Sequence, residues 1–426
     1  MSKPIHQLSI AEAVRQMEIG ELTAKRLTLA FLERIEARND AVRAFVAHDA
    51  DLALREAAAV DSGKRGGYLK GIPFAVKDTI QTADYPTTCG SPIYEGYQAG
   101  RDAGCVAKSR EEGAVLLGKV ATGEFATQTP GLARNPLNLG HTPGGSSSGS
   151  AAAVGDGMAM AAWGSQTTGS IIRPAVYCGV VGYKPSFGLI TTAGVSVLSP
   201  LQDTVGVLTR TVQDAASFVF GVHGSQVRLQ RGSRPLRLGV CASSQWEFAK
   251  PETIEAIERL IARASAAGAD IRRIPLPDEF ESLIALQGKI VAYDARHALA
   301  HENLNHPNLL SPRLAARISS GLDMDVEEYI AASRTVAECR HRVRALFDGV
   351  DALIYPAAEG EAEAGIQNSG SPRFGALWTL LHLPTVAFPI GRGPANLPLG
   401  VQLVGDFGDD IALLNVADAM QAWADY

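Results

Sequence analysis

The stretch GIPFAVKD, residues 71–78, decides how the rest of the chain is interpreted. Its apolar run is short and uninterrupted, which is typical of a strand that is buried on both faces of a sheet. A second run of this kind, GAVLLGKV at 113–120, follows a helical segment. Buried strands that alternate with helices indicate an α/β layer architecture. We therefore predict a single large α/β/α layered fold, in which helices flank a central twisted mixed sheet.

The alternation continues in the C-terminal half. Within residues 236–275, LRLGVC and DIRRIPL flank a helical segment that runs from Pro251 to about Ala267, which predicts a β-α-β unit. A helical stretch is then expected over 283–347. Three late strands and a final helix follow at 351–356, 383–390, 399–405 and 409–424.

The N-terminal segment carries helix signals. Ser9 followed by Glu12 resembles a capping box, and a third helix is expected at 50–61. We predict that residues 1–65 form a helical segment that packs on the core. Residues 66–426 are predicted to form one intertwined α/β domain, because no internal repeat or low-complexity linker divides them.

Composition limits the classes of function. The chain has 426 residues, 46% of them apolar and 20% charged, which is ample for a large buried core. The net charge of −6 and the absence of any block of like charges argue against a nucleic-acid or anionic-membrane partner. The first ten residues lack the apolar core of a signal peptide, and no apolar run reaches transmembrane length. A cytoplasmic location is the expectation.

Metal and cofactor signals are weak. The five cysteines are scattered, so neither a disulfide nor a structural zinc site is predicted. His297 and His301 have i, i+4 spacing, but no glutamate of the HExxH type stands between them. We predict no metal and no cofactor.

Two segments carry unusual chemistry, and the first is TPGGSSSGSAAAV at 142–154. Glycine permits tight turns and serine caps helices, so this segment alone leaves a phosphate-binding loop or a plain helix cap open. It matches neither the P-loop nor the GxGxxG pattern, which argues against nucleotide binding.

The second segment, GSQTTGSIIRPA at 164–175, brings successive backbone N–H groups beside Ser170. Such donors suit an oxyanion. No histidine is near to act as a base, and the GxSxG pattern is missing. A lysine can accept the proton if burial lowers its pKa, and Lys77, at the end of an apolar strand, is the best candidate. The alternative is an ordinary surface pair of Lys77 with Asp78.

Taken together, these segments resemble the amidase signature family. In that family a lysine follows a GxPxxVKD strand, a GGSSGGSAAA loop supplies a bridging serine, and the nucleophile closes a GxDTGGSIRxPA loop. Ser146 and Ser170 stand 24 residues apart, as the family's motif serines do. The resemblance is strong over 66–210 and weaker over 351–410. Residues 211–350 carry no diagnostic motif, and in the family this variable region helps to shape the substrate funnel.

The resemblance implies a catalytic triad. Lys77 would be neutral and accept a proton from Ser146, Ser146 would accept one from Ser170, and Ser170 would attack the amide carbonyl to give an acyl-enzyme. The family also places a cis backbone at Ser146, and Gly145 is expected beside the substrate. The oxyanion hole would be formed by the backbone N–H groups of Thr167, Thr168, Gly169 and Ser170.

The nucleophile loop departs from the family pattern. Gln166 replaces the usual aspartate, Thr168 replaces a glycine, and the arginine stands one position later, as Arg173. This form is most similar to malonamidase and related small-amide hydrolases, which implies that Arg173 and Gln166 bind substrate. A guanidinium fork suits bidentate carboxylate binding. The alternative is that Arg173 ties loops together, for example through Asp203. Thr168 would disturb the loop if a positive φ were required there.

We therefore expect an amidase that hydrolyses a non-peptide carbon–nitrogen bond of a small, carboxylate-bearing amide and releases ammonia or an amine. The alternative is the glutaminase component, called A, of a tRNA-dependent amidotransferase complex, although that role usually retains the DTGGSIR form. A non-catalytic relative that only binds is disfavoured by the intact serine and lysine motifs. The expected partner is the small-molecule substrate, and a homodimer is compatible with the sequence.

Overall fold

The computed structural model describes residues 3–230, 232 and 234–426. Its strands are β1 (Phe45–His48), β2 (Pro73–Lys77), β3 (Val115–Val120), β4 (Ala161–Gln166), β5 (Val181–Lys184), β6 (Thr204–Thr209), β7 (Arg237–Ala242), β8 (Asp270–Pro275), β9 (Ala352–Pro356), β10 (Thr385–Arg392) and β11 (Pro398–Val404). Its α-helices are α1 (Ile10–Glu18), α2 (Ala24–Val42), α3 (Ala50–Asp61), α4 (Gly104–Glu111), α5 (Ser148–Gly155), α6 (Ile172–Tyr177), α7 (Val212–Gly221), α8 (Pro251–Ala266), α9 (Asp278–Ala298), α10 (Ala300–Asn305), α11 (Pro312–Ser320), α12 (Val326–Arg342), α13 (Arg373–Leu380) and α14 (Asp410–Gln421).

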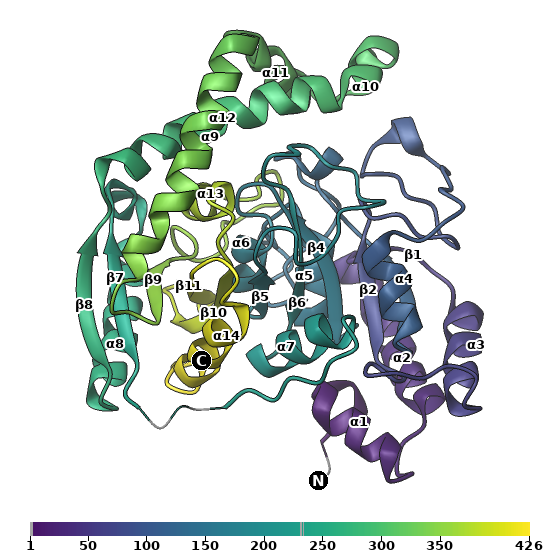
Figure 1. Ribbon diagram of the computed structural model, residues 1–426. Coiled ribbons are helices and arrows are strands. Elements are labelled where there is room, and N and C mark those ends of the chain that lie inside the picture. Colours follow the sequence, from purple (N-terminus) through teal and green to yellow (C-terminus); the bar gives the residue numbers. More distant parts are fainter. Residues whose placement is uncertain (1–2, 231, 233) are drawn as a thin grey trace.

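All these strands join one mixed sheet, in the spatial order β1-β3-β2-β4-β6-β5-β10-β11-β9-β7-β8, with helices packed around it (Figure 1). The predicted α/β layered fold is confirmed. The central strands β2, β3, β4 and β6 are buried at every position, which is why their sequences lack the polar alternation of a half-exposed strand. Strands from the two halves of the chain are neighbours in the sheet, since β5 pairs with β10.

The N-terminal segment is not purely helical. Phe45–His48 forms the edge strand β1, which pairs antiparallel to β3. The Asn39 side chain fixes the approach to this strand, because it donates to the carbonyl of Phe45 and accepts from its N–H. The expected third helix is confirmed as α3. The prediction of a helical segment at 1–65 missed a four-residue strand, which is too short to show a period of its own.

The positions predicted for the C-terminal strands agree closely with the structure, whereas the strands in the middle of the chain were missed. The β-α-β unit is β7, α8 and β8, and the three predicted C-terminal strands are β9, β10 and β11. Strands β4, β5 and β6 were not predicted. In β4, whose sequence is AAWGSQ, small residues obscure the pattern of a strand. Gly164 in β4 shows the reason, since a Cβ there would lie 2.9 Å from Oγ of Ser147.

The predicted helical stretch is a cap of helices that stands above one end of the sheet (Figure 1). It begins with the long helix α9 and continues through α10, α11 and α12. Helices α9 and α11 pack against each other, and Val291, Ala295, Leu314 and Ile318 belong to one apolar cluster between them. None of the helices in the described ranges is long and apolar enough to cross a membrane.

Candidate active site

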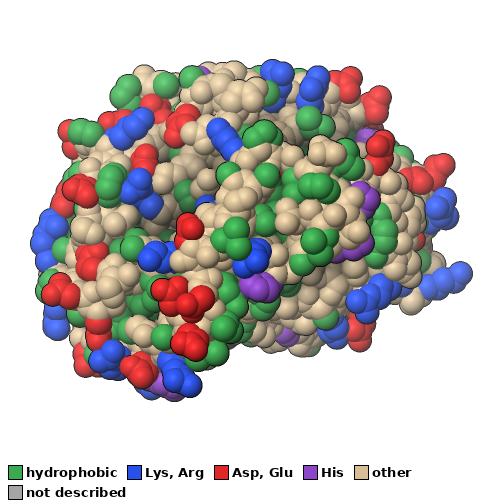
Figure 2. All heavy atoms as spheres, turned by 90° about the horizontal axis from the view of Figure 1, so that it is seen from above, with side chains coloured by type: hydrophobic (Ala, Val, Ile, Leu, Met, Phe, Trp, Pro, Cys, Tyr) green, Lys and Arg blue, Asp and Glu red, His purple; other side chains and the backbone are tan. Residues whose placement is uncertain are grey.

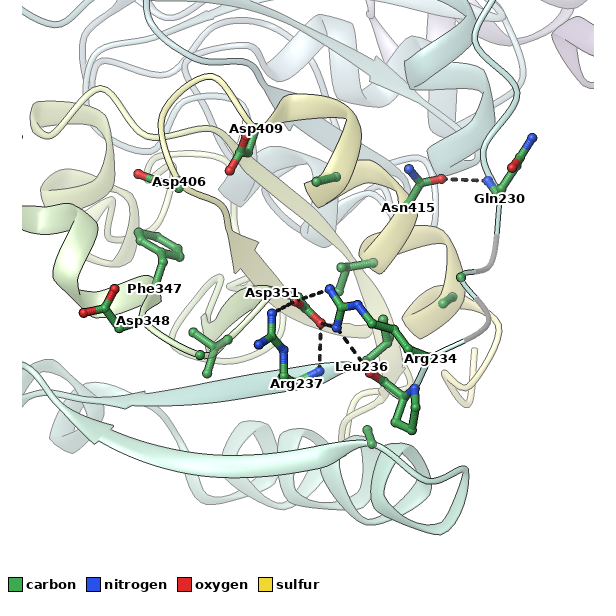
Figure 3. A pocket seen from close by; sticks show the side chains of 18 of the residues that line it. Gln230, Arg234, Leu236, Arg237, Phe347, Asp348, Asp351, Asp406, Asp409 and Asn415 are labelled. Carbon is green, nitrogen blue, oxygen red and sulfur yellow. Dashed lines mark hydrogen bonds and ion pairs between the residues drawn. The ribbon is translucent and has the colours of Figure 1, made fainter.

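Two cavities are candidates for a functional site. The larger, of about 800 Å³, lies between the start of β7 and α14 (Figure 3). Arg234 and Arg237 in it are both paired with Asp351, and the described residues that line it include no serine, threonine, cysteine or lysine. The smaller cavity, of about 470 Å³, is lined by Ser170, so this second cavity is the candidate active site.

Lys77 is the last residue of β2 and has no exposed surface. Its Nζ is hydrogen bonded to Oγ of Ser146 at 2.8 Å and to Oγ of Ser165 at 2.9 Å. Burial lowers the pKa of the Lys77 ammonium group to about 7. The shift arises because an ammonium ion loses its hydration in the interior. A fraction of Lys77 is therefore a neutral amine at physiological pH.

Two carboxyl groups bear on the charge of Lys77. Asp78, the partner in the surface-pair alternative, binds Nζ of Lys119 at 3.1 Å in a buried ion pair, which leaves Lys77 to the serines. Asp203 is buried and opposes the drop in the pKa of Lys77, because a nearby negative charge favours the ammonium form. The backbone N–H of Leu198 donates to Oδ2 of Asp203 at 2.6 Å.

The two serine loops meet in the structure. Ser146 is 2% exposed and follows a cis peptide bond with Gly145, as the family resemblance implied. The N–H of Ser147 donates to the carbonyl of Ser170 at 3.2 Å, which joins the loops next to the lysine. Lys77 and Ser146 are thus in direct contact, and the segment of Ser146 is joined by a backbone hydrogen bond to Ser170, which lines the cavity.

The nucleophile loop runs from the end of β4 into α6. Thr168 does not adopt a positive φ, so the expected disturbance at this position does not arise. Its Oγ1 accepts a hydrogen bond from Nε2 of Gln287 at 3.0 Å, and its carbonyl accepts one from Oγ1 of Thr379 at 3.0 Å. Gly375 lets α13 approach the loop, because a Cβ there would lie 2.4 Å from the Thr168 carbonyl. The threonine is therefore held from two sides.

Arg173 is anchored within the protein. Its Nε donates to the carbonyl of Ser369 at 2.6 Å, and its Nη2 donates to the carbonyl of Gly145 at 2.5 Å. Nη1 is buried without a hydrogen-bond partner among the described residues, and Arg173 lines the cavity. Both N–H groups of Nη1 and one N–H of Nη2 remain for a ligand. Arg173 therefore ties two loops together, as the alternative interpretation held, although through these carbonyls and not through Asp203. A role in binding the substrate carboxylate stays a prediction.

Gln166 and Gly145 do not line the cavity. Oε1 of Gln166 accepts from the N–H groups of Ile171 and Ile172 at 2.8 and 3.1 Å, and its Nε2 donates to Oγ1 of Thr379. The side-chain amide of Gln166 thus accepts hydrogen bonds as the carboxylate of an aspartate would, and it also donates one. Gly145 serves the site through its carbonyl, which Arg173 binds. Substrate contacts by these two residues are not supported by their positions.

Several residues near the site were not found from the sequence. Ser165 contacts Lys77, and only its place in the quoted nucleophile segment hinted at it. Gln287 comes from α9, and Arg313 and Arg317 line the cavity from α11. These helices lie in the region without diagnostic motifs. The sequence there predicts helices by its periodicity, but it does not indicate which part of the protein each helix contacts. The cavity is thus completed by the variable region.

Comparisons with known proteins cover almost the whole chain. A family model described as Amidase matches residues 26–414. The A component of the glutamyl-tRNA(Gln) amidotransferase of Roseiflexus sp. (strain RS-1) is 32% identical over 475 aligned positions, which cover 99% of this chain and 97% of that protein. A crystal structure of an amidase has a TM-score of 0.89 and 30% identity, over 98% of this chain and 100% of that chain. The peptide amidase of Stenotrophomonas maltophilia has a TM-score of 0.83 and 27% identity, over 99% of this chain and 98% of that chain.

Proposed function

The chain belongs to the amidase family, and we propose that it hydrolyses the carbon–nitrogen bond of a small, carboxylate-bearing amide through Ser170, Ser146 and Lys77. The observation that carries the proposal is the hydrogen bond of 2.8 Å between the buried Nζ of Lys77 and Oγ of Ser146. A lysine whose pKa is lowered to about 7 is a base at the pH of a cell. The malonamidase-like branch remains a prediction, since the relatives compared above bear other names.

The proposed reaction moves one proton from Ser170 through Ser146 to Lys77. Neutral Lys77 accepts the proton of the Ser146 hydroxyl, and Ser146 accepts the proton of the Ser170 hydroxyl as Ser170 Oγ attacks the carbonyl carbon. The tetrahedral intermediate then breaks its carbon–nitrogen bond, and the relay returns the proton to the leaving nitrogen. Water repeats the sequence on the acyl-enzyme and releases the acid.

The loop between β4 and α6 would stabilise the negative charge that develops on the carbonyl oxygen. Its backbone N–H groups, from Thr167 to Ser170, are the proposed oxyanion donors, and each such donor is worth about 3 kcal/mol of barrier. The contacts of Thr168 with Gln287 and Thr379 hold this loop in place before substrate arrives. Preorganised donors of this kind need no rearrangement during the reaction.

A second candidate is the glutaminase component of a tRNA-dependent amidotransferase. The near full-length match to the A component of such an enzyme favours it. The charges of the residues that line the cavity favour the hypothesis of a small-amide hydrolase instead. Glutamine carries an α-ammonium group, which requires an anionic partner, and the described residues that line the cavity include three arginines and no carboxylate. The cytoplasmic location and a homodimer stay predictions under either candidate.

The test of the proposal is a panel assay for ammonia release. We expect the wild-type protein to hydrolyse dicarboxylic monoamides or ureido acids faster than neutral aliphatic or aryl amides and faster than glutamine. Ser170→Ala is expected to lose at least about 10³-fold in kcat/KM, as removal of a nucleophile does. The exposed Ser282→Ala on α9 serves as the matched control. Full activity of Ser170→Ala would exclude the mechanism.

Partner capture separates the two candidates. The small-amide reading expects the tagged chain to purify alone with its full activity. Stoichiometric co-purification with other proteins of an amidotransferase complex, together with a preference for glutamine in the panel, would replace it with the amidotransferase reading.

A further inference from the structure

We propose that Arg317, with Arg313 one helical turn before it, binds the carboxylate of the substrate, so that helix α11 sets the charge preference of the enzyme. This inference deepens the proposed function and rests on it. The ligand class is an amide whose acyl part carries a carboxylate away from the scissile carbonyl.

The placement of the two arginines follows from helix geometry. Residues three and four apart lie on one face of a helix. Arg313, Ala316, Arg317 and Ser320 follow this spacing, and all four line the cavity that Ser170 also lines. Helix α11 therefore presents one face to the active site, and the guanidinium groups are the only charged groups on that face.

Arg317 has no partner among the residues that the structure describes. Its side chain is half-buried, and its guanidinium group makes no hydrogen bond or ion pair with any described residue. Burial lowers the pKa of Arg317, and no carboxylate opposes the effect. Desolvating a cation without a counter-ion is unfavourable, and a like charge four residues away adds repulsion. A bound anion would remove both penalties.

Arg313 stands at the exposed side of the same face. Its Nη1 donates to the carbonyl of Gln128 at 3.4 Å, a long contact that leaves most of its donors free. The outer surface around this cap is not generally basic, because acidic and basic side chains are scattered over it together (Figure 2). The arginines of the cavity are thus a local feature and not part of a wider positive patch.

The contacts of Arg173 support this assignment. Its Nε and one N–H of its Nη2 are used by the carbonyls of Ser369 and Gly145, so the Nε–Nη2 side of its fork is not available to a carboxylate. Arg317 retains its whole fork, which is the geometry that suits bidentate recognition. Arg173 Nη1 has no hydrogen-bond partner among the described residues and remains free to donate to the same ligand.

The experiment compares one dicarboxylic monoamide with a neutral aliphatic amide of equal chain length. Arg317→Gln is expected to lower kcat/KM for the monoamide by about 30–100-fold, mainly through KM, as expected for a charged hydrogen-bonded pair. Its kcat/KM for the neutral amide is expected to stay within about twofold. Arg317→Lys should recover part of the loss, and Arg334→Gln, an exposed arginine of α12, should behave as wild type. An equal loss on both substrates, or no loss on either, would overturn the inference.

A binding measurement keeps the test independent of turnover. The dicarboxylate product should raise the melting temperature of the wild-type protein and of Ser170→Ala, and should fail to do so for Arg317→Gln. Equal stabilisation of all three would contradict the inference. If the wild-type protein hydrolyses the neutral amide through Ser170 with no preference for the monoamide, only this inference fails. If it hydrolyses no amide at all, the proposed function fails.

Discussion

Lys77 shows how a single residue acquires its chemistry from its position. The apolar strand GIPFAV carries it into the interior, where Ser146 and Ser165 replace water around its nitrogen. The strand and the lysine could be predicted from the sequence. Ser165 could not, because its contact with Lys77 depends on the parallel pairing of β2 with β4.

The pH dependence of activity follows from this burial. The pKa of Lys77 is lowered to about 7, so the neutral base predominates above that pH and the inactive ammonium form predominates below it. We predict that kcat/KM rises with pH, has its midpoint near 7 and levels off on the alkaline side. A pH–rate profile from 5.5 to 9 measures this, with circular dichroism as a check on folding. A flat profile over that range would assign the base to another group.

Gln166 leads to a prediction about stability. Its Oε1 satisfies the buried N–H groups of Ile171 and Ile172 at the start of α6. Gln166→Ala leaves both donors unpaired, which should lower the free energy of unfolding by about 2–4 kcal/mol. Urea denaturation measures the change, with the exposed Gln98→Ala as control. An unchanged unfolding midpoint together with a raised KM would restore the predicted substrate role.

At the scale of elements, the cap helices matter because they complete the active site from outside the family's motifs. Helix α9 reaches the nucleophile loop through Gln287, which donates to Thr168 and to Gln202. The helical character of this region could be predicted from periodicity. Its function could not, since periodicity reports which face is apolar and not what the polar positions contact.

Removing the Gln287 side chain should loosen the loop of residues 167–170, which carries the proposed oxyanion donors. We predict that Gln287→Ala lowers kcat about tenfold or more, because displaced donors stabilise the transition state less well. Lys289→Ala, an exposed change on the same helix, should leave kcat unchanged. Steady-state kinetics on the preferred amide tests both variants. A Gln287→Ala variant with wild-type kcat would show that the loop does not depend on α9.

At the scale of the whole molecule, the N-terminal segment is joined to the rest of the chain by strand pairing and by buried polar contacts. Strand β1 pairs with β3, and the N–H of Ile10 donates to the buried carboxylate of Asp214 at 2.8 Å. Asp156 also binds Arg34 and Arg38 of α2. The α/β fold was predicted correctly. The edge strand β1 could not be predicted, because pairing between distant segments leaves little signal in the local sequence.

We therefore predict that residues 1–65 cannot be removed. Their deletion would expose the edge of β3. It would also expose the apolar surface against which Phe31 and Ile35 are buried, so the remaining chain should fail to fold into a stable enzyme. Differential scanning calorimetry of the intact chain should give one cooperative transition. Two separate transitions, or a stable and active truncated chain, would make the N-terminal segment an independent domain.

The central claim is that buried Lys77 activates Ser170 through Ser146, and covalent labelling tests it most directly. A fluorophosphonate reacts with an activated serine to form an oxygen–phosphorus bond and release fluoride, and it needs no knowledge of the substrate. The account predicts one adduct per chain, located at Ser170 by peptide mass spectrometry, with a labelling rate that falls below pH 7. It also predicts at least about 10²-fold slower labelling in folded Lys77→Ala and Ser146→Ala, as for loss of a general base. An adduct at another residue, or an unchanged labelling rate in those two variants, would contradict it.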